Sequence, residues 1–266
     1  MAVLERLTVA VVAGTCLAAV TAGCRRDTVR VSYRPPLGAH SRHEVRVHSE
    51  TTVQLAGSPE DHSVDDVVLV TDETVLDADP DGVHVEVRLH QEGAPDRTFV
   101  VRLDRAAQLA GVEAVEGLPP SVLGSDALPQ LLPGAAGAPP DRPLAPGERW
   151  SIDAPAPPGA GSGRLTGSGR LVELGLLDGH KVASTRSSTR LPLSTTTPLR
   201  GSVAALDGVE STEGTATRAL SDGTVERAKT VTRGRFELTL APAGTAAAPP
   251  LHGFLSLEVR SQTRRL

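Results

Sequence analysis

Hydrophobic and polar residues alternate along most of this chain, and the alternation is nearly strict between positions 43 and 55. One face of this segment is mainly apolar and carries His43, Val45, Val47, Ser49, Thr51, Val53 and Leu55. The other face is polar and carries Arg42, Glu44, Arg46, His48, Glu50, Thr52 and Gln54. A period of two over this length predicts a long, half-buried strand.

The same alternation returns at Val83, Val85, Val87 and Leu89. Further strands are predicted over 28–33, 66–76, 98–103, 171–177, 181–191, 214–220, 224–240 and 251–260. We expect the aliphatic residues of 43–55 and 83–89 to share one concave or core-facing surface. A shift of one residue would turn all of them towards water.

Asp-Gly pairs separate several of these segments, within 79–82, 177–180 and 221–224. Asp-Gly is typical of tight hairpin turns, so successive strands are expected to pair as an antiparallel meander. The fold class expected is therefore mainly β, as one or more antiparallel meander sheets, with a duplicated half-barrel as one arrangement.

The middle of the chain has a different composition. Residues 120–132 predict one short central helix, which Gly124 and Pro129 shorten or break. A connector rich in Pro, Gly and Ala follows to Pro146, and 155–169 is expected to be flexible. We divide the chain into a signal peptide (1–23), an N-terminal β half (24–117), the helix and connector (118–147) and a C-terminal β half (148–266).

The N-terminus has the layout of a secretory signal. Arg6 precedes an apolar run from Leu7 to Val20, and Thr21-Ala22-Gly23-Cys24 follows. Small residues before a cysteine form a lipobox, so we expect Cys24 to carry the lipid, palmitate included, that anchors the chain on the extracytoplasmic side of a cell-envelope membrane. The alternative is a plain signal peptide in which Cys24 is incidental.

Composition narrows the classes of function. The only other cysteine, Cys16, lies inside the signal, so no disulfide or thiolate metal site is expected. The net charge is −5, which disfavours nucleic acid as a partner. Aromatic residues make up 2% of the chain, too few for a stacking platform, so any ligand surface is expected to be aliphatic.

A faint internal repeat is present. Residues 33–38 introduce the first long strand, and 141–147 introduce Trp150 and the second set of strands. Each opening precedes strands and an Asp-Gly turn that is closely followed by a histidine. Duplication explains this pattern, and so does the frequency of Pro/Gly openings and Asp-Gly turns in β proteins.

The order of lipobox, strand opening, alternating strands, central helix and the motif Pro-x-x-Pro-Gly-x-x-Trp from Pro143 to Trp150 resembles uncharacterised bacterial envelope lipoproteins of unknown function. The resemblance covers most of the chain after Cys24 and implies no catalytic residue. The expected architecture is also distantly similar to half-barrel lipoproteins that carry lipids.

Asp77, Asp79, Asp81 and Gly82 match the opening of a calcium loop. The twelfth position, where such a loop needs a carboxylate, is Arg88. A tight turn with Gly82 in the left-handed conformation explains the same residues, and we favour the turn over a metal site.

Six histidines fall in the first half of the chain: His40, His43, His48, His62, His84 and His90. His43 and His48 face opposite sides of their strand, and six extended residues place His84 and His90 about 20 Å apart. A cross-strand pair, such as His48 with His84 or His90, is possible, but a zinc site needs three or four converging ligands, so solvated histidines on strand faces are expected.

No sequence motif for a nucleophile, a phosphate loop or a dinucleotide cofactor is found, so neither catalytic residues nor a cofactor are assigned. Residues 60–66 are rich in acid and histidine and are expected to form a solvated loop. We expect a non-catalytic, membrane-anchored binding or structural module whose partner is a hydrophobic ligand or an envelope protein. Alternatives are a carrier of a lipid-like ligand and a hydrolase without a recognisable motif.

Overall fold

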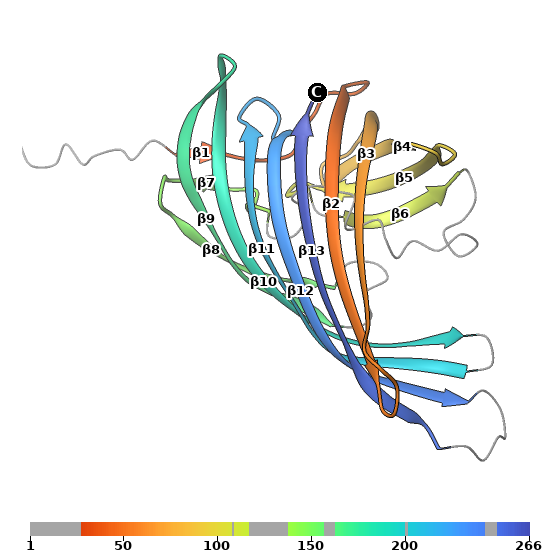
Figure 1. Ribbon diagram of the computed structural model, residues 1–266. Helices are drawn as coiled ribbons and strands as arrows, with labels where there is room; N and C mark the ends of the chain where they lie inside the picture. Colours follow the sequence, from red (N-terminus) through yellow and green to blue (C-terminus); the bar gives the residue numbers. More distant parts are fainter. Residues whose placement is uncertain (1–27, 108, 117–137, 157–162, 200–201, 243–248) are drawn as a thin grey trace, which may run out of the picture.

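The computed structural model describes residues 28–107, 109–116, 138–156, 163–199, 202–242 and 249–266 (Figure 1). The expected signal peptide, Cys24 and the expected helix over 120–132 lie outside these residues. No helix is found in the described residues, and thus none there that could cross a membrane.

Most of the described residues form strands. Their bounds are β1 (Val29–Arg30), β2 (His40–Leu55), β3 (Asp61–Ala78), β4 (Gly82–Gln91), β5 (Arg97–Asp104), β6 (Leu109–Val115), β7 (Pro143–Leu144), β8 (Arg149–Pro155), β9 (Arg164–Leu177), β10 (His180–Leu199), β11 (Ser202–Ala219), β12 (Val225–Pro242) and β13 (Leu251–Arg265).

Eleven of these strands form a single antiparallel sheet in the order β6-β5-β4-β3-β2-β13-β12-β11-β10-β9-β8. Each half of the chain is a meander, and the first strand of one half pairs with the last strand of the other. The expected antiparallel meander is confirmed, and the strands after Trp150 join the same sheet rather than a second one. The short β1 and β7 pair separately.

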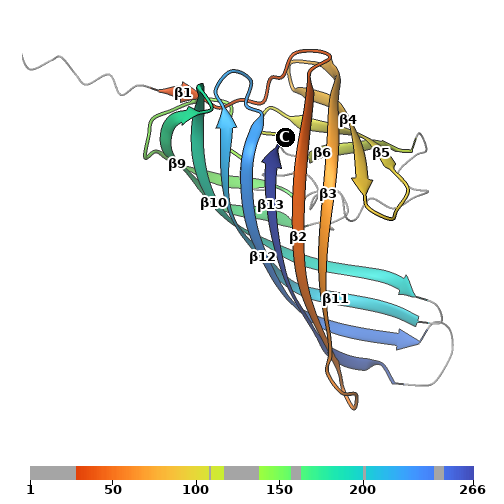
Figure 2. The ribbon, with the colours of Figure 1, turned by 45° about the horizontal axis from the view of Figure 1, so that its top comes forward.

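The sheet is strongly curved. The long strands bend along their length. The C-terminal ends of β10 and β12 and the start of β11 bend towards the side of the long strands on which β4–β6 lie (Figures 1 and 2). We call the end with the β2–β3 turn and the ends of β12 and β13 at Pro242 and Leu251 the far end. The near end carries the β9–β10 and β11–β12 turns.

Two apolar clusters occupy one face of the sheet at the near end. The first spans β2–β6 and includes Val45, Val85 and Tyr33. The second spans β8–β10 and includes Trp150, Leu171 and Val31. Tyr33 belongs to the first cluster and Val31 to the second, although the two clusters lie on strands at opposite sides of the sheet. One short segment can reach both clusters only if the sheet curves around it. The face that carries both clusters, which we call the inner face, is therefore the concave one.

The same segment is hydrogen-bonded to both halves of the sheet. The Tyr33 N–H donates to the Arg105 carbonyl at 2.9 Å, and the Arg34 N–H donates to the Asp222 carbonyl at 2.7 Å. Backbone bonds to partners so distant in sequence hold the two meanders together at the near end, in a chain with no disulfide among its described residues.

The expected shared apolar face is confirmed. Val45, Val83, Val85 and Val87 are at most 3% exposed, and Leu89 is 9% exposed. Val47 packs against the same cluster. Val53 and Leu55 share the face of Val45 on β2 but lie beyond the cluster, where they are half-buried.

Two expectations about loops are wrong. The stretch 163–169 belongs largely to β9, because Gly169 leaves room for the Trp150 indole, whose ring atoms would lie 2.1–2.5 Å from a Cβ at that position. Residues 61–66 are strand rather than solvated loop and pair with β2. They are polar because β4 begins to pair with β3 only at Leu69, which leaves this part of β3 at an edge.

Candidate functional site

The inner face continues from the second cluster, to which Leu191 belongs, towards the far end as three rows of residues that cross the sheet. The middle row is Leu193, Gly208, Phe236, Leu255 and Val53. The row on its far-end side is Thr195, Leu206, Leu238, Gly253 and Leu55. The row on its near-end side is Leu191, Glu210, Gly234, Leu257 and Thr51. We call these fifteen residues the inner rows.

Phe236 shapes the floor of the inner rows. A Cβ on Gly208 would lie 2.8 Å from its ring, and a Cβ on Gly234 would lie 2.5 Å from it. The ring therefore lies flat across the two glycines and is 4% exposed. Most of the surrounding side chains are aliphatic, Glu210 being the exception, and Leu206, Leu255 and Leu257 are only half-buried. The result is a low, apolar surface on the concave side of five neighbouring strands.

Glu210 is the one ionisable residue in the inner rows. Its direct cross-strand neighbours are Leu191 and Gly234. No ion pair or hydrogen bond to its carboxylate is found in the described part of the chain. Burial raises the pKa of Glu210 because nothing compensates the carboxylate for lost water.

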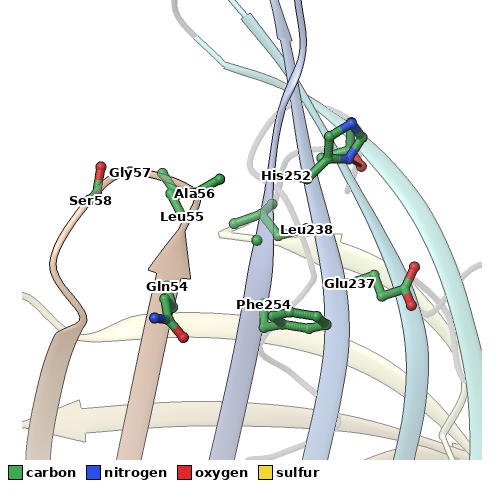
Figure 3. Close-up of a pocket in the computed structure, with 11 residues that line it drawn as sticks. Gln54, Leu55, Ala56, Gly57, Ser58, Glu237, Leu238, His252 and Phe254 are labelled. Atoms are coloured by element: carbon green, nitrogen blue, oxygen red, sulfur yellow. Dashed lines mark hydrogen bonds between the residues drawn. The ribbon is translucent and has the colours of Figure 1, made fainter.

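A depression of about 540 Å³ lies at the far ends of β2, β12 and β13. Most of the side chains that line it, such as Gln54, Glu237 and Phe254, alternate with inner-row residues and therefore belong to the opposite face of the sheet. Figure 3 shows Phe254 between Gln54 and Glu237, with Leu238 and His252 nearer the ends of the strands. Phe254 is 50% exposed, and the Arg235 guanidinium lies 5.9 Å from its ring centroid. The face opposite the inner rows thus carries an exposed aromatic ring with polar neighbours at this end of the sheet.

A buried polar centre lies at the near end. His43 is 1% exposed, its Nδ1 lies 3.3 Å from Glu73 Oε1, and its Nε2 lies 3.0 Å from the Val225 carbonyl oxygen. Burial opposes the charge on His43, but the Glu73 carboxylate and the Val225 carbonyl outweigh it, so the pKa of His43 is raised. Both ring nitrogens face acceptors, which fits an imidazolium that is ion-paired with Glu73.

Arg218 completes this centre and is also 1% exposed. Its Nη1 donates to the Gly223 carbonyl at 3.3 Å. Burial lowers the pKa of Arg218 to about 10, against the opposing influence of Tyr33 and Asp104. Burial together with Glu73 raises the pKa of Tyr33. These charges lie where the N-terminal segment crosses the sheet.

The cavity beside this centre is about 30 Å³ and is lined by Tyr33, His43, Glu73 and Thr224 among others. A volume of this size holds one water molecule and no organic substrate. The arrangement is therefore suited to holding the N-terminal segment in place, and it offers no access for a reactant.

The aspartates of the calcium-like motif serve the β3–β4 turn. Asp79 Oδ1 accepts hydrogen bonds from the N–H groups of Asp81 and Gly82, both at 2.8 Å, and Arg102 Nη2 lies 3.0 Å from Oδ2. The backbone donors, more than Arg102, lower the pKa of Asp79 against the effect of burial. Asp77 Oδ1 accepts from the Ala78 N–H. The expected turn is present.

One detail of that turn differs from expectation. Gly82 does not have a positive φ, in contrast to Gly179 and Gly223 in the other two Asp-Gly turns. Glycine is required at position 82 because a Cβ would lie 2.5 Å from the Leu103 carbonyl oxygen. The close approach of β5 therefore replaces backbone handedness as the reason for this glycine.

The other histidines are separated from one another. His48 lies between Glu50 and Asp66, His84 beside Glu113, and His90 between Asp72 and Asp96, all at 2.8–3.1 Å. His40 and His62 contact threonines. Within the described ranges no group of three or more His, Cys, Asp or Glu side chains could hold a metal ion.

His43 does not fit the expectation of solvated histidines, and sequence reasoning missed its pairing with Glu73. A signal was available, because the alternation already placed His43 on the face of Val45. Arg218 carried no such signal, since its burial depends on the N-terminal segment that covers it. Sequence reasoning also missed Glu210, whose segment lies before the strand expected from position 214.

No family model matches this chain, and no curated protein matches its sequence.

Proposed function

We propose that this chain is a non-catalytic, membrane-anchored protein of the cell envelope that carries an elongated hydrophobic ligand on the concave face of its sheet. In this proposal the sheet is a half-barrel, the two halves descend from a duplication, and the expected central helix covers part of the hollow. The lipobox cysteine, Cys24, holds the protein at the membrane.

The observation that carries this proposal is the character of the inner rows. They form a mainly apolar surface on the concave side of five strands, most of it beyond the two clusters that stabilise the near end. A sheet that only had to fold would not need strands of 15–20 residues reaching past those clusters. An apolar, concave surface with few polar groups is typical of sites for hydrophobic ligands.

A non-catalytic role is supported by the polar groups that the described residues bring together. The buried His43–Glu73 pair adjoins a cavity of about 30 Å³, which excludes a substrate. Glu210 lies among apolar neighbours without a second ionisable residue in the inner rows. General acid–base chemistry needs convergent groups within reach of a substrate.

The anchor is tested by Cys24→Ser. Removing the acylation site should move the protein from the membrane fraction to the soluble fraction, because each buried CH₂ of an acyl chain contributes about 0.8 kcal/mol to membrane binding. Continued sedimentation of the Cys24→Ser protein with membranes in high salt would contradict the lipobox interpretation.

The ligand surface is tested by a matched pair of neighbouring substitutions. Leu257→Trp adds bulk to the inner rows, whereas Ser256→Trp adds the same side chain to the opposite face, where Ser256 is exposed. The full chain is titrated with a fluorescent fatty acid. We expect Leu257→Trp to weaken binding by about tenfold, which corresponds to 1.4 kcal/mol, and Ser256→Trp to leave it unchanged.

Equal affinities in the two variants and the unmodified protein would place the probe outside the inner rows. Absence of binding in all three would refute the carrier proposal and favour a structural role towards another envelope protein. Mass spectrometry of gently extracted protein gives an independent readout, since a carrier should retain an apolar molecule that Leu257→Trp displaces.

A further inference from the structure

The outer, convex face of the sheet carries a row of basic side chains at one level. The cross-strand partners along this row are Arg149, Arg170, Arg186, Thr215, Lys229, Gln262 and Arg46. The first three arginines are direct neighbours on β8, β9 and β10. Directly opposed side chains on adjacent strands have Cβ atoms about 5 Å apart.

The four cations at the β8 end of this row differ from the other arginines of the outer face. Arg149, Arg170, Arg186 and Lys229 are exposed, and within the described residues none of them has an ion-pair or hydrogen-bond partner. By contrast, the structure pairs most outer-face arginines with carboxylates. Examples are Arg42 with Asp72, Arg97 with Glu116 and Arg233 with Glu258, at 2.8–3.5 Å.

Like charges directly opposite each other destabilise a sheet. The chain has a net charge of −5, so this concentration of unpaired positive charge does not follow from a generally basic composition. Carboxylates neutralise arginines elsewhere on the same face, whereas among the described residues none forms an ion pair with the three arginines that stand side by side. Such a row is stabilised when an anion binds across it.

The surface is hollowed at the same place. A depression of about 730 Å³ is lined by the four cations together with the hydroxyl groups of Ser168 and Ser188. Glu213 also lines it, so four positive charges face one negative charge. A second depression of about 440 Å³ adjoins the first at Lys229 and contains Arg46, Arg227 and Arg264 with Glu44.

We propose that this depression is a binding site for a phosphate-class oxyanion, held by Arg149, Arg170, Arg186 and Lys229. Guanidinium groups match phosphate oxygens with two parallel hydrogen bonds, and the serine hydroxyls add neutral donors. The volume is that of a small-molecule site. The phosphate belongs to a lipid headgroup or to a soluble phosphate ester, which share this chemistry. The site lies on the face opposite the inner rows and does not depend on the carrier proposal.

The test compares two triple variants of the full chain carrying Cys24→Ser, so that acylation does not dominate membrane binding. One variant is Arg149→Gln, Arg170→Gln and Arg186→Gln. The control is Arg42→Gln, Arg97→Gln and Arg233→Gln, which removes the same charge from ion-paired, exposed positions. Pyrophosphate binding is measured by calorimetry, and sedimentation is measured with vesicles of phosphatidylglycerol or of phosphatidylcholine.

We expect the first triple variant to bind pyrophosphate, phosphatidylglycerol vesicles or both about tenfold more weakly, and the control to bind like the parent protein. Without ligand, the melting temperature of the first variant should rise by about 1–4 °C, because like charges no longer face each other. Binding to pyrophosphate alone identifies a soluble anion, and binding to phosphatidylglycerol alone identifies a headgroup.

Three results would overturn the site. The first is that the parent protein binds neither probe at about 0.1 M salt, where charges more than about 10 Å apart are largely screened. The two triple variants could lose binding equally, which would mean that only total charge matters. The parent could also bind phosphatidylcholine as tightly as phosphatidylglycerol, which would mean that the phosphate oxyanion is not the group recognised.

Discussion

Gly169 is a position where one added methyl group should be strongly destabilising. It is buried in β9, directly opposite Trp150 on β8. A Cβ built at this position would lie 2.1 Å from Cε2, 2.2 Å from Cζ2 and 2.5 Å from Nε1 of the indole. Carbon atoms in contact need about 3.5–4.0 Å, so Gly169→Ala forces the ring to leave its place.

The cost follows from what Trp150 contributes. It is 6% exposed and packs in the cluster of Val31, Leu144 and Leu171. A buried tryptophan removes about 150–250 Å² from water, which is worth about 4–6 kcal/mol at 25 cal/mol per Å². Partial repacking recovers some of this. We therefore expect Gly169→Ala to lower the free energy of unfolding by about 2–4 kcal/mol.

The matched control is Gly175→Ala in the same strand, where a Cβ would meet no atom within 4 Å. This change should leave stability the same or raise it by about 0.4–1 kcal/mol, because alanine restricts the unfolded chain. Trp150 is the only tryptophan, so its fluorescence reports unfolding in urea directly. Its emission in the folded state should shift to the red in Gly169→Ala alone.

A double-mutant cycle separates this mechanism from a general effect on the strand. In a Trp150→Leu background, followed by circular dichroism, Gly169→Ala should cost less than about 1 kcal/mol. The reasoning is refuted if the cost of Gly169→Ala is the same with and without the indole, or if Gly175→Ala is equally destabilising.

Two further predictions concern buried titratable groups. The raised pKa of His43 stabilises the fold below the unfolded-state pKa of about 6.5, and this contribution is lost as the pH rises through the folded-state pKa. Urea unfolding between pH 6 and 9 should show this decline, and a decline that persists in His43→Gln would assign it to another group. The raised pKa of Glu210 means that its charged form weakens the fold as the pH rises above the unfolded-state value. Glu210→Gln should therefore raise the melting temperature at pH 7 and lose that advantage near pH 4; no gain at pH 7 would show that the carboxylate is solvated.

The alternation of hydrophobic and polar residues and the Asp-Gly turns predicted much of the fold. The alternation in 43–55 and 83–89 specified which side chains lie on the inner face, including His43, and the Asp-Gly turns located three hairpins. These features depend on neighbours along the chain: a strand turns successive side chains to opposite faces, and a tight turn needs particular backbone angles. They could therefore be predicted without knowing any tertiary contact.

Glycines and charged residues were interpreted less well, because their meaning depends on what lies across from them. Gly169 looked like linker sequence until Trp150 was placed against it. The acidic residues after Glu60 looked like a loop, although β2 pairs with them as an edge of the sheet. In both cases the partner belongs to another strand, and composition alone favoured the wrong state.

The pairing of β2 with β13 could not be predicted from the sequence. It joins residues about two hundred positions apart, such as Val47 and Ser261, and it makes one curved sheet from two meanders. The inner rows, and the row of basic side chains from Arg149 to Arg46 on the outer face (the basic row), form only because the strands pair in this sheet with this register. Each arginine of the basic row is an ordinary outward-facing residue in its own strand, and only hydrogen bonding between strands aligns it with the next. Periodicity is a property of a single strand, whereas register is decided by the free energy of burying a whole face.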